Sequence, residues 1–385
     1  MGSSRSLLVF LVMVLSSPAF AQGATAVAPL PADPLELATG DTLKVANPEN
    51  RALVLNLLER ARQNGSELYA AGGPAFHLKV SFTSSGQSRY TGSGEMEEIR
   101  YSRFTSWRWT ARLGDYWQVR VFQNGVPYDE KTPGPIPLRV QMVRGAVIWP
   151  MSNVRPGTMI RMASAQWHGM EVMCTLLSFD EAATAAHGRH WHEREYCVDT
   201  KSALLRIYSE APGIYTVYDY ADALHFHGRT LARDISIVES GDTVLQIHVE
   251  SLEDAGAPDP ALFTPTKEML ARGSGIVLVP SVRIPAGAAP PAGHTGKIEP
   301  VIVHASVDYQ GKVMEAETLQ NSDPSLSSAA LALVKSSTYP PQTRASGPVQ
   351  TEAFINVEFG AGRQLRNLAA GRMYSPSDSM SESNS

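Results

Sequence analysis

The first regular hydrophobic pattern along the chain is helical. Between Asn47-Pro48 and Asn64-Gly65, apolar residues recur every three or four positions, at Leu53, Val54, Leu57, Leu58 and Ala61. This spacing predicts one amphipathic helix of about four turns, with the proline in its first turn.

From residue 76 onward the pattern is typical of β-strands. Phe76, Leu78, Val80 and Phe82 point one way, and the polar residues between them point the other. Similar runs follow at short intervals, at residues 89–101, 104–113, 116–122, 159–163, 169–179, 203–208, 214–220, 229–239 and 243–251. The pattern predicts a curved antiparallel β half-barrel or open barrel, with residues 137–149 as a short helix over part of it.

A second unit is expected near the C-terminus. Its first strand alternates, so that His304 lies opposite Val301, Val303, Ala305 and Val307 and is expected on the surface. A return strand at 312–319, a helix after Ser322-Asp323-Pro324 and a last strand at Thr351–Phe359 complete the order β-β-α-β. The predicted fold class is therefore α+β: a curved antiparallel half-barrel with an N-terminal helix, followed by a small β-β-α-β domain.

Composition supplies the expected boundaries. Ala-, Pro- and Thr-rich residues 22–46 predict a linker, and Pro/Ala/Gly-rich residues 266–295 predict a second one. Ser-rich residues 360–385 predict a disordered tail. The two compact units are therefore expected at 47–265 and 296–359, in line with about two domains for a chain of this length.

The N-terminal residues have the pattern of an export signal. Arg5 precedes an apolar run from Leu7 to Leu15, and Ala19-Phe20-Ala21 offers a small-x-small cleavage site. This arrangement predicts a signal peptide over residues 1–21, cut after Ala21, and a periplasmic or secreted protein. The alternative is an inner-membrane anchor formed by residues 7–20, although this run is short for a bilayer span.

The charge balance narrows the range of partners. The chain has 33 Lys+Arg and 38 Asp+Glu, which gives a formal net charge of −5. Nucleic-acid binding draws on clustered Lys and Arg to neutralise phosphates, so a nucleic-acid partner is not expected. Because 43% of the residues are hydrophobic, wholesale disorder is not expected either.

Export also makes a disulfide possible. The chain has two cysteines, Cys174 and Cys197, in strand-like apolar runs that are separated by a polar, turn-like stretch. An antiparallel pair of strands would bring them together, so we predict a Cys174–Cys197 bridge. The alternative of a catalytic Cys–His pair is disfavoured, because thiols in apolar surroundings are usually inert.

A histidine-rich segment is a candidate metal site. His187, His190 and His192 lie beside acidic residues, and imidazole with carboxylate suits zinc or copper. The spacing matches no defined zinc motif, and Arg189 and Arg194 would repel a cation. An exposed hairpin between the two cysteine strands is the plainer interpretation.

Three tryptophans are candidates for lining a ligand concavity. Trp107 and Trp109 share one face of a predicted strand, and Trp117 lies on the next strand. Core packing and cross-strand pairing are the plainer interpretation of such aromatic residues.

Catalytic motifs are absent from the sequence. It contains no Gly-rich phosphate loop, no G-x-S-x-G elbow and no H-E-x-x-H. The sequence therefore predicts a protein that is not an enzyme, and it indicates no cofactor. A Ser–His hydrolase assembled from distant segments stays an open alternative.

A series of short motifs runs through the C-terminal unit in a fixed order. Val307-Asp308-Tyr309-Gln310-Gly311-Lys312-Val313 is followed by a helix with Ala329-Ala330, by Tyr339-Pro340-Pro341 and by a final strand that closes on Phe359. This order resembles the C-terminal domain of the TonB energy-transducer family.

The resemblance implies a periplasmic domain that binds outer-membrane transport proteins by adding a strand to the edge of its sheet. The resemblance implies that the last strand, Thr351–Phe359, or its neighbour offers this edge. The implied partner-binding residues on the last strand are Thr351, Ala353, Ile355, Val357 and Phe359. The family's membrane helix and Pro/Lys/Glu spacer are replaced here by an expected signal peptide and a large β unit. A binding module that reuses the fold is therefore expected, rather than energy transduction.

The large unit is similar in pattern to the periplasmic lipoprotein-carrier superfamily of LolA-like and LppX-like half-barrels. The shared features are an N-terminal helix, a run of antiparallel strands, and closing segments around Ile235-Ser236-Ile237 and Asp259-Pro260-Ala261. This resemblance implies an apolar concavity that holds acyl chains.

Two functions follow as hypotheses. The first is a non-enzymatic periplasmic binding or adaptor protein that engages an outer-membrane or other envelope protein by β-strand addition. The second is a periplasmic carrier of lipid or lipoprotein that holds acyl chains in the half-barrel. Mass spectrometry of molecules extracted from the purified protein would distinguish the two.

Overall fold

The structure, a computed structural model, describes most of the chain between residues 43 and 360. The described residues are 43–45, 47–65, 68, 73–102, 106–178, 189–257, 259–320 and 323–360. Several predictions lie outside them: the signal peptide, residues 22–42 of the first linker, His187 and residues 361–385 of the tail.

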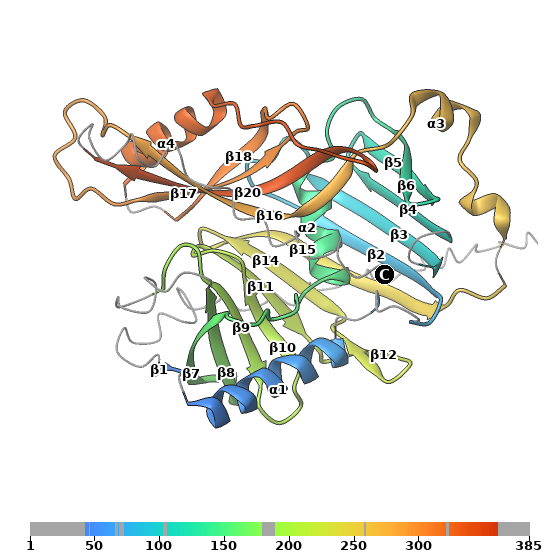
Figure 1. Ribbon diagram of the computed structural model, residues 1–385, viewed down its shortest axis with the longest axis horizontal. Coiled ribbons are helices and arrows are strands. Elements are labelled where there is room, and N and C mark those ends of the chain that lie inside the picture. The colour runs from blue at the N-terminus through green and yellow to red at the C-terminus, as the bar shows by residue number, and fades with distance from the viewer. Residues whose placement is uncertain are drawn as a thin grey trace, which may run out of the picture.

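Thirteen antiparallel strands form one large curved sheet that does not close (Figure 1). The sheet order is β1-β7-β8-β9-β10-β11-β14-β15-β2-β3-β4-β5-β6, so the central pair of β15 and β2 joins two meanders. The predicted open half-barrel is confirmed. The strands are β1 (Leu43–Lys44), β2 (Phe76–Ser84), β3 (Gly92–Ser102), β4 (Ser106–Leu113), β5 (Tyr116–Gln123), β6 (Val126–Lys131), β7 (Met159–Trp167), β8 (Met170–Ser178), β9 (Arg194–Asp199), β10 (Leu205–Ser209), β11 (Ile214–Asp219), β14 (Asp234–Glu239) and β15 (Asp242–Asp254), with a separate hairpin of β12 (Leu224–Phe226) and β13 (Arg229–Leu231).

The predicted N-terminal helix is α1 (Pro48–Gly65). Asn47 begins it, because its side-chain oxygen accepts a hydrogen bond from the backbone N–H of Glu49 at 2.8 Å. The buried stripe is Val54, Leu57, Leu58 and Ala61, while Leu53 is 70% exposed. The helix contacts β9, β10 and β13 (Figure 1).

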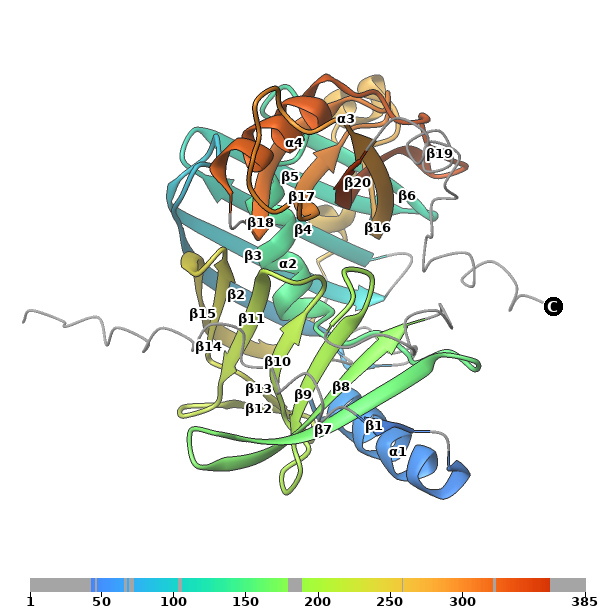
Figure 2. The ribbon, with the colours of Figure 1, turned by 90° about the vertical axis from the view of Figure 1, so that its left-hand side faces the viewer.

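A second helix, α2 (Leu138–Ile148), lies inside the curve of the large sheet (Figure 2). Nine of its eleven residues are buried, so it is covered on nearly all sides. Its apolar residues belong to the same core as those of the large sheet. The short helix predicted at 137–149 is therefore present, and it occupies the inner side of the half-barrel.

The C-terminal unit is a smaller mixed sheet of order β16-β20-β17-β18, with α4 on one face (Figure 1). Asp323 caps α4, since its carboxylate accepts from the backbone N–H of Ser325 at 2.8 Å. The predicted β-β-α-β order is present as β17, β18, α4 and β20. The elements are β16 (Val277–Ala288), β17 (Val301–Val307), β18 (Val313–Gln320), α4 (Pro324–Ser336), β19 (Thr343–Arg344) and β20 (Gly347–Phe359).

The segment predicted as a linker at 266–295 contains regular structure. It follows the short helix η3 (Pro260–Phe263) and includes α3 (Lys267–Arg272) and β16. The Pro/Ala/Gly-rich composition from Pro285 onward suggested a linker, but proline is tolerated in an edge strand. The linker prediction is therefore corrected: β16 belongs to the small sheet.

The two faces of the small sheet contact different partners. Val301, Val303 and other alternate residues pack with α4. On the opposite face, Ile302, Leu319 and Phe354 join the core of the large sheet. His304 lies on this second face and is fully buried, which corrects its expected place on the surface. It is buried because the half-barrel covers the face that the sequence pattern left open.

Candidate functional site

The predicted partner-binding strand, β20, lies inside the small sheet. β16 pairs with it in parallel on one side, and β17 pairs with it in antiparallel fashion on the other. The strand is therefore not a free edge in this structure, and the expected arrangement is corrected on this point. A partner-binding role for it stays a prediction. All of the predicted residues are buried: Thr351, Ala353, Ile355, Val357 and Phe359.

Glu210 holds β16 against the half-barrel. Its Oε1 accepts hydrogen bonds from Ser281 Oγ at 2.7 Å, Arg283 Nη2 at 3.0 Å and Arg194 Nε at 2.9 Å. Burial raises the pKa of Glu210, but the charges of Arg194 and Arg283 outweigh it and hold the pKa below its usual value. Two residues of β16 thus contact one buried carboxylate of the large unit.

His304 in β17 joins the two sheets at a second point. Its Nδ1 lies 2.8 Å from Glu239 Oε1, and its Nε2 lies 2.8 Å from Glu352 Oε1. The ring stacks on Phe354 with the ring centroids 4.6 Å apart. Burial lowers the pKa of His304, but the hydrogen bonds to the two carboxylates outweigh it and raise the pKa to about 9. The side chain is therefore positively charged at neutral pH.

Arg139 in α2 extends this contact into a network. Its buried guanidinium bonds Glu239 (Nη1 to Oε2, 2.7 Å) and Glu317 (Nη2 to Oε2, 2.6 Å). Burial raises the pKa of Glu239, but His304 and Arg139 outweigh it and lower the pKa to about 2. At Glu317, burial is the larger effect and raises the pKa. Such a network fixes the relative orientation of the units, because losing one partner leaves an uncompensated buried charge.

The small unit also caps the N-terminus of α2. The helix has no side-chain cap of its own at Pro137, and the backbone N–H of Leu138 donates to Glu315 Oε1 at 3.1 Å. Just before the helix, the Gln350 amide accepts from the N–H of Ile136 at 2.9 Å and donates to its carbonyl at 2.6 Å. A carboxylate is favourable at this end of a helix dipole. The helix and the small unit therefore stabilise each other's position.

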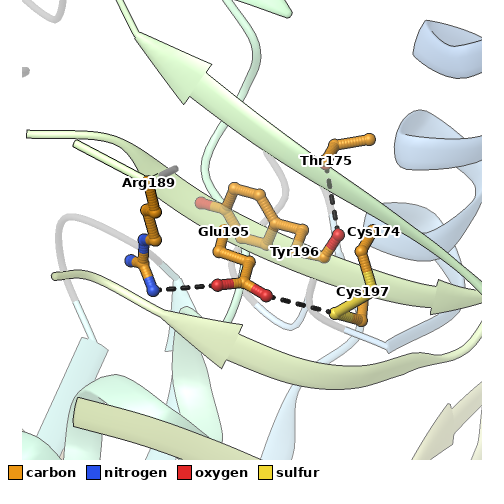
Figure 3. The surroundings of a disulfide bond; sticks show 6 residues. All are labelled: Cys174, Thr175, Arg189, Glu195, Tyr196 and Cys197. Atoms are coloured by element: carbon orange, nitrogen blue, oxygen red, sulfur yellow. Dashed lines mark hydrogen bonds and ion pairs between the residues drawn. A yellow bond between two sulfur atoms is a disulfide. The ribbon is translucent and has the colours of Figure 1, made fainter. Parts of the chain in front are cut away.

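The predicted disulfide joins two neighbouring strands of the large sheet (Figure 3). Cys174 in β8 lies directly opposite Cys197 in β9 in the antiparallel ladder. Beside it, Glu195 Oε1 lies 3.5 Å from Cys197 Sγ, and Glu195 Oε2 accepts from Arg189 Nη1 at 2.8 Å. The pair is buried, and both cysteines are used in the bridge. This sequence prediction is confirmed.

Of the histidine segment, the structure describes His190 and His192, and neither belongs to a group of three or more metal-ligand side chains among the described residues. His190 and His192 stack with their ring centroids 5.4 Å apart. The neighbouring Glu193 is already paired with Arg161, at 2.5 Å between Oε2 and Nη2. Within the described ranges, the one group of three or more metal-ligand side chains is Cys174, Glu195 and Cys197, where the disulfide uses both sulfur atoms.

Two of the candidate tryptophans face α2. Trp107 and Trp109 are buried on the inner face of β4, whereas Trp117 is 41% exposed and does not join them. The Arg144 guanidinium of α2 lies 4.9 Å from the ring centroid of Trp107 and 5.2 Å from that of Trp109. Glu98 accepts from Trp107 Nε1 at 2.6 Å and from Arg144 Nε at 3.0 Å. Trp107 and Trp109 thus help to position α2 against the sheet.

The sequence pattern did not predict the charged residues at the interface between the two units. Arg139 lies in an apolar helix, Glu239 ends an apolar strand, and Arg283 lies between apolar residues. A charge inside an apolar run is a signal of a buried, paired group. One sequence does not say which charge meets which, because these partners lie far apart along the chain.

The C-terminal part of the chain is similar to a known protein family. Residues 292–360 match the model of a family described as Gram-negative bacterial TonB protein C-terminal. The resemblance seen in the sequence motifs is confirmed. The matched residues include β17, β18, α4 and β20 but not β16. No helix among the described residues is both long enough and apolar enough to span a membrane.

Among solved structures, a LolA superfamily protein from Nitrosomonas europaea is similar to 55% of this chain and 96% of its own, with 10% identity and a TM-score of 0.35. MucB in complex with MucA(peri) is similar to 56% of this chain and 58% of its own, with 14% identity and a TM-score of 0.21. Both TM-scores are below 0.5, so neither likeness supports a functional conclusion. No curated protein matches the chain.

Proposed function

We propose that the protein is a non-enzymatic adaptor of the Gram-negative periplasm that binds an extended segment of an envelope protein by β-strand addition to the small sheet. The observation that carries the proposal is the match of residues 292–360 to the TonB C-terminal family. Main-chain hydrogen bonds at a sheet edge supply affinity without requiring a pocket. The export signal expected over residues 1–21 is consistent with this compartment.

Strand addition is favoured at the end of the small sheet that is formed by β16 and β20. At the other end, β18 faces the half-barrel, where Ser240 Oγ donates to the carbonyls of Thr318 (2.9 Å) and Leu319. Two backbone carbonyls of β18 therefore already accept a hydrogen bond from the half-barrel. A partner would reach the sheet at the end formed by β16 and β20.

A carrier function is less well supported than an adaptor function. The inner side of the half-barrel, which would hold acyl chains, is filled by α2. Arg144 of this helix is bonded to Glu98 and stacked on Trp107. A carrier would have to expel the helix and leave the buried Glu98 unpaired, which is costly. Acyl chains recovered by mass spectrometry from the purified protein would reverse this preference.

The interface supports a binding role rather than catalysis. Its buried carboxylates, Glu210 and Glu239, are each bonded to cationic side chains within the chain. Groups paired in this way hold two units in one orientation.

Site-specific photo-crosslinking in intact cells tests the adaptor proposal. A photoreactive residue replaces Glu358, which is exposed on β20, and in a control it replaces Glu95, which is exposed on β3. We expect a covalent product with an outer-membrane protein from position 358 alone, mapped by mass spectrometry to an extended segment of that protein. Identical products at both positions, or none at 358, would contradict the proposal.

A further inference from the structure

β16 occupies the edge of β20 along almost its whole length. In the parallel register, Val277 is opposite Val349 and Ala288 is opposite Phe359. The two are the only strands paired in parallel within the described part of the chain. A strand that pairs in this way uses the same backbone groups of β20 that an added strand from another protein would use.

One side of β16 completes the core of the small unit. Val282 and Ile284 belong to the hydrophobic cluster that includes Leu326 of α4, and Ala286 and Ala288 pack against that cluster. Every second residue from Val282 to Ala288 is thus apolar, and the last two of them are alanines. This alternation is what a strand requires when one of its faces is buried.

The other side of β16 faces the half-barrel. Arg283 donates to Glu210 Oε1 at 3.0 Å, to the Glu210 carbonyl, and to the His192 carbonyl at 3.0 Å. Ser281 donates to the same carboxylate. The large unit therefore contributes directly to the position of β16, through one buried anion.

Several features make β16 an irregular strand. The ladder has a bulge between Val279 and Val282, and Pro280 and Pro285 have no N–H to donate. Gly287, near the C-terminal end, supplies no side chain to pack. β20 pairs with β17 without a register shift, so a partner segment that replaces β16 on β20 adds to a more regular strand than one that adds to β16.

We propose that β16 is an internal placeholder that closes the partner-binding edge of β20 until a competing segment replaces it. The inference rests on the adaptor function proposed above and adds to it the chemistry of the partner. The competing segment is extended and runs parallel to β20. It carries aliphatic or small residues at alternate positions and one cationic side chain between them, which takes the place of Arg283 at Glu210.

A peptide with the sequence of residues 277–288, isotopically heavy and fluorescently labelled, is the probe. It is titrated into the full-length protein and into the Arg283→Ala variant. In this variant the chain's own arginine no longer binds Glu210, so the arginine of the peptide can bind there. We expect at least tenfold tighter binding to the variant than to the unchanged protein. A peptide in which this arginine is alanine should lose most of that gain.

A locked variant supplies the control. Ala286 is opposite Val357 in the register, so Ala286→Cys with Val357→Cys, added to the Arg283→Ala protein, can join β16 to β20. The oxidised form should not bind the peptide, and mild reduction should restore binding. If the variants fold poorly, hydrogen exchange on the unchanged protein serves instead: excess heavy peptide should speed exchange of the chain's own residues 277–288 but not of β17.

Equal binding to the unchanged and Arg283→Ala proteins, binding to the oxidised locked form, or unchanged exchange of residues 277–288 would overturn the inference. These results are distinct from failure of the adaptor function. If the locked protein still crosslinks an envelope partner from position 358, the placeholder idea fails and the adaptor function stands. If the peptide displaces β16 but no envelope partner is found, the adaptor function fails.

Discussion

His304 Nδ1 lies 2.8 Å from Glu239 Oε1, although the two residues belong to different sheets and are 65 positions apart in the chain. The contact is buried, and Arg139 and Glu352 complete it. It links the small sheet to the half-barrel and to α2 at once. The network makes the docking of the small unit sensitive to protonation.

The stability of the protein should fall at alkaline pH because of His304. The pKa of His304 in the folded state is about 9, above its ordinary value of 6.5. The stabilisation, on the order of 3 kcal/mol, is therefore fully present below pH 6.5 and is lost as the pH rises through 9. Urea unfolding should show the His304→Gln variant less stable at pH 6.5 and nearly equal to the unchanged protein at pH 10.

The exposed His225 supplies the control for this prediction. The His225→Gln variant should follow the unchanged protein at both pH values. A stability gap for His304→Gln that does not narrow between pH 6.5 and 10 would show that His304 is not charged in the folded protein. The acidic members Glu239 and Glu317 and the cation Arg139 face the same network, so all measurements use one buffer system above pH 6.

Removal of the disulfide should destabilise the half-barrel. The bridge closes a loop between cysteines 23 positions apart, and loops of this size contribute about 3 kcal/mol by restricting the unfolded chain. Urea unfolding with and without reductant should show this difference. A Cys174→Ser/Cys197→Ser variant should be less stable by a similar amount, and reductant should not change its stability. Equal stability of all forms would show that the disulfide does not stabilise the protein.

Loss of the Glu315 carboxylate should loosen α2. This side chain from the small unit caps the helix at Leu138, and loss of a helix cap typically costs about 1 kcal/mol. Hydrogen exchange across residues 138–148 should become faster in Glu315→Ala. The exposed Glu253→Ala variant should leave exchange there unchanged. Unchanged exchange in Glu315→Ala would mean that the small unit does not hold the helix.

Gly311 should tolerate no side chain. Its φ is +82°, and a Cβ at this position would clash with the backbone carbonyl of Tyr339. Gly125 has φ +81° but open space around it, so it isolates the cost of the left-handed backbone. Gly311→Ala should lose about 3 kcal/mol or more in the free energy of unfolding, and Gly125→Ala about 1 kcal/mol. Equal losses would show that the Tyr339 contact is not tight.

Most local elements of the fold follow from the pattern of residues along the chain. Spacings of three and four residues predicted α1, alternation predicted most strands of the half-barrel and the strands β17, β18 and β20 of the small unit, and two strand-borne cysteines predicted their own pairing. These predictions succeed because helix and strand periodicities are local properties of the chain. The motif order in the small unit was sufficient to indicate its family.

Which element covers each face of a sheet depends on contacts between residues far apart in the chain. Alternation in β17 separated His304 from the valines, but it did not show that α4 covers one face of the small sheet and the half-barrel covers the other. The prolines of residues 277–288 suggested a linker, yet that segment is a strand, because β20 supplies the ladder and Glu210 binds Arg283. Burial and charge pairing depend on residues that are distant in sequence. A periodic pattern fixes which side of its own strand or helix a side chain lies on, but it does not fix which other element packs against that side.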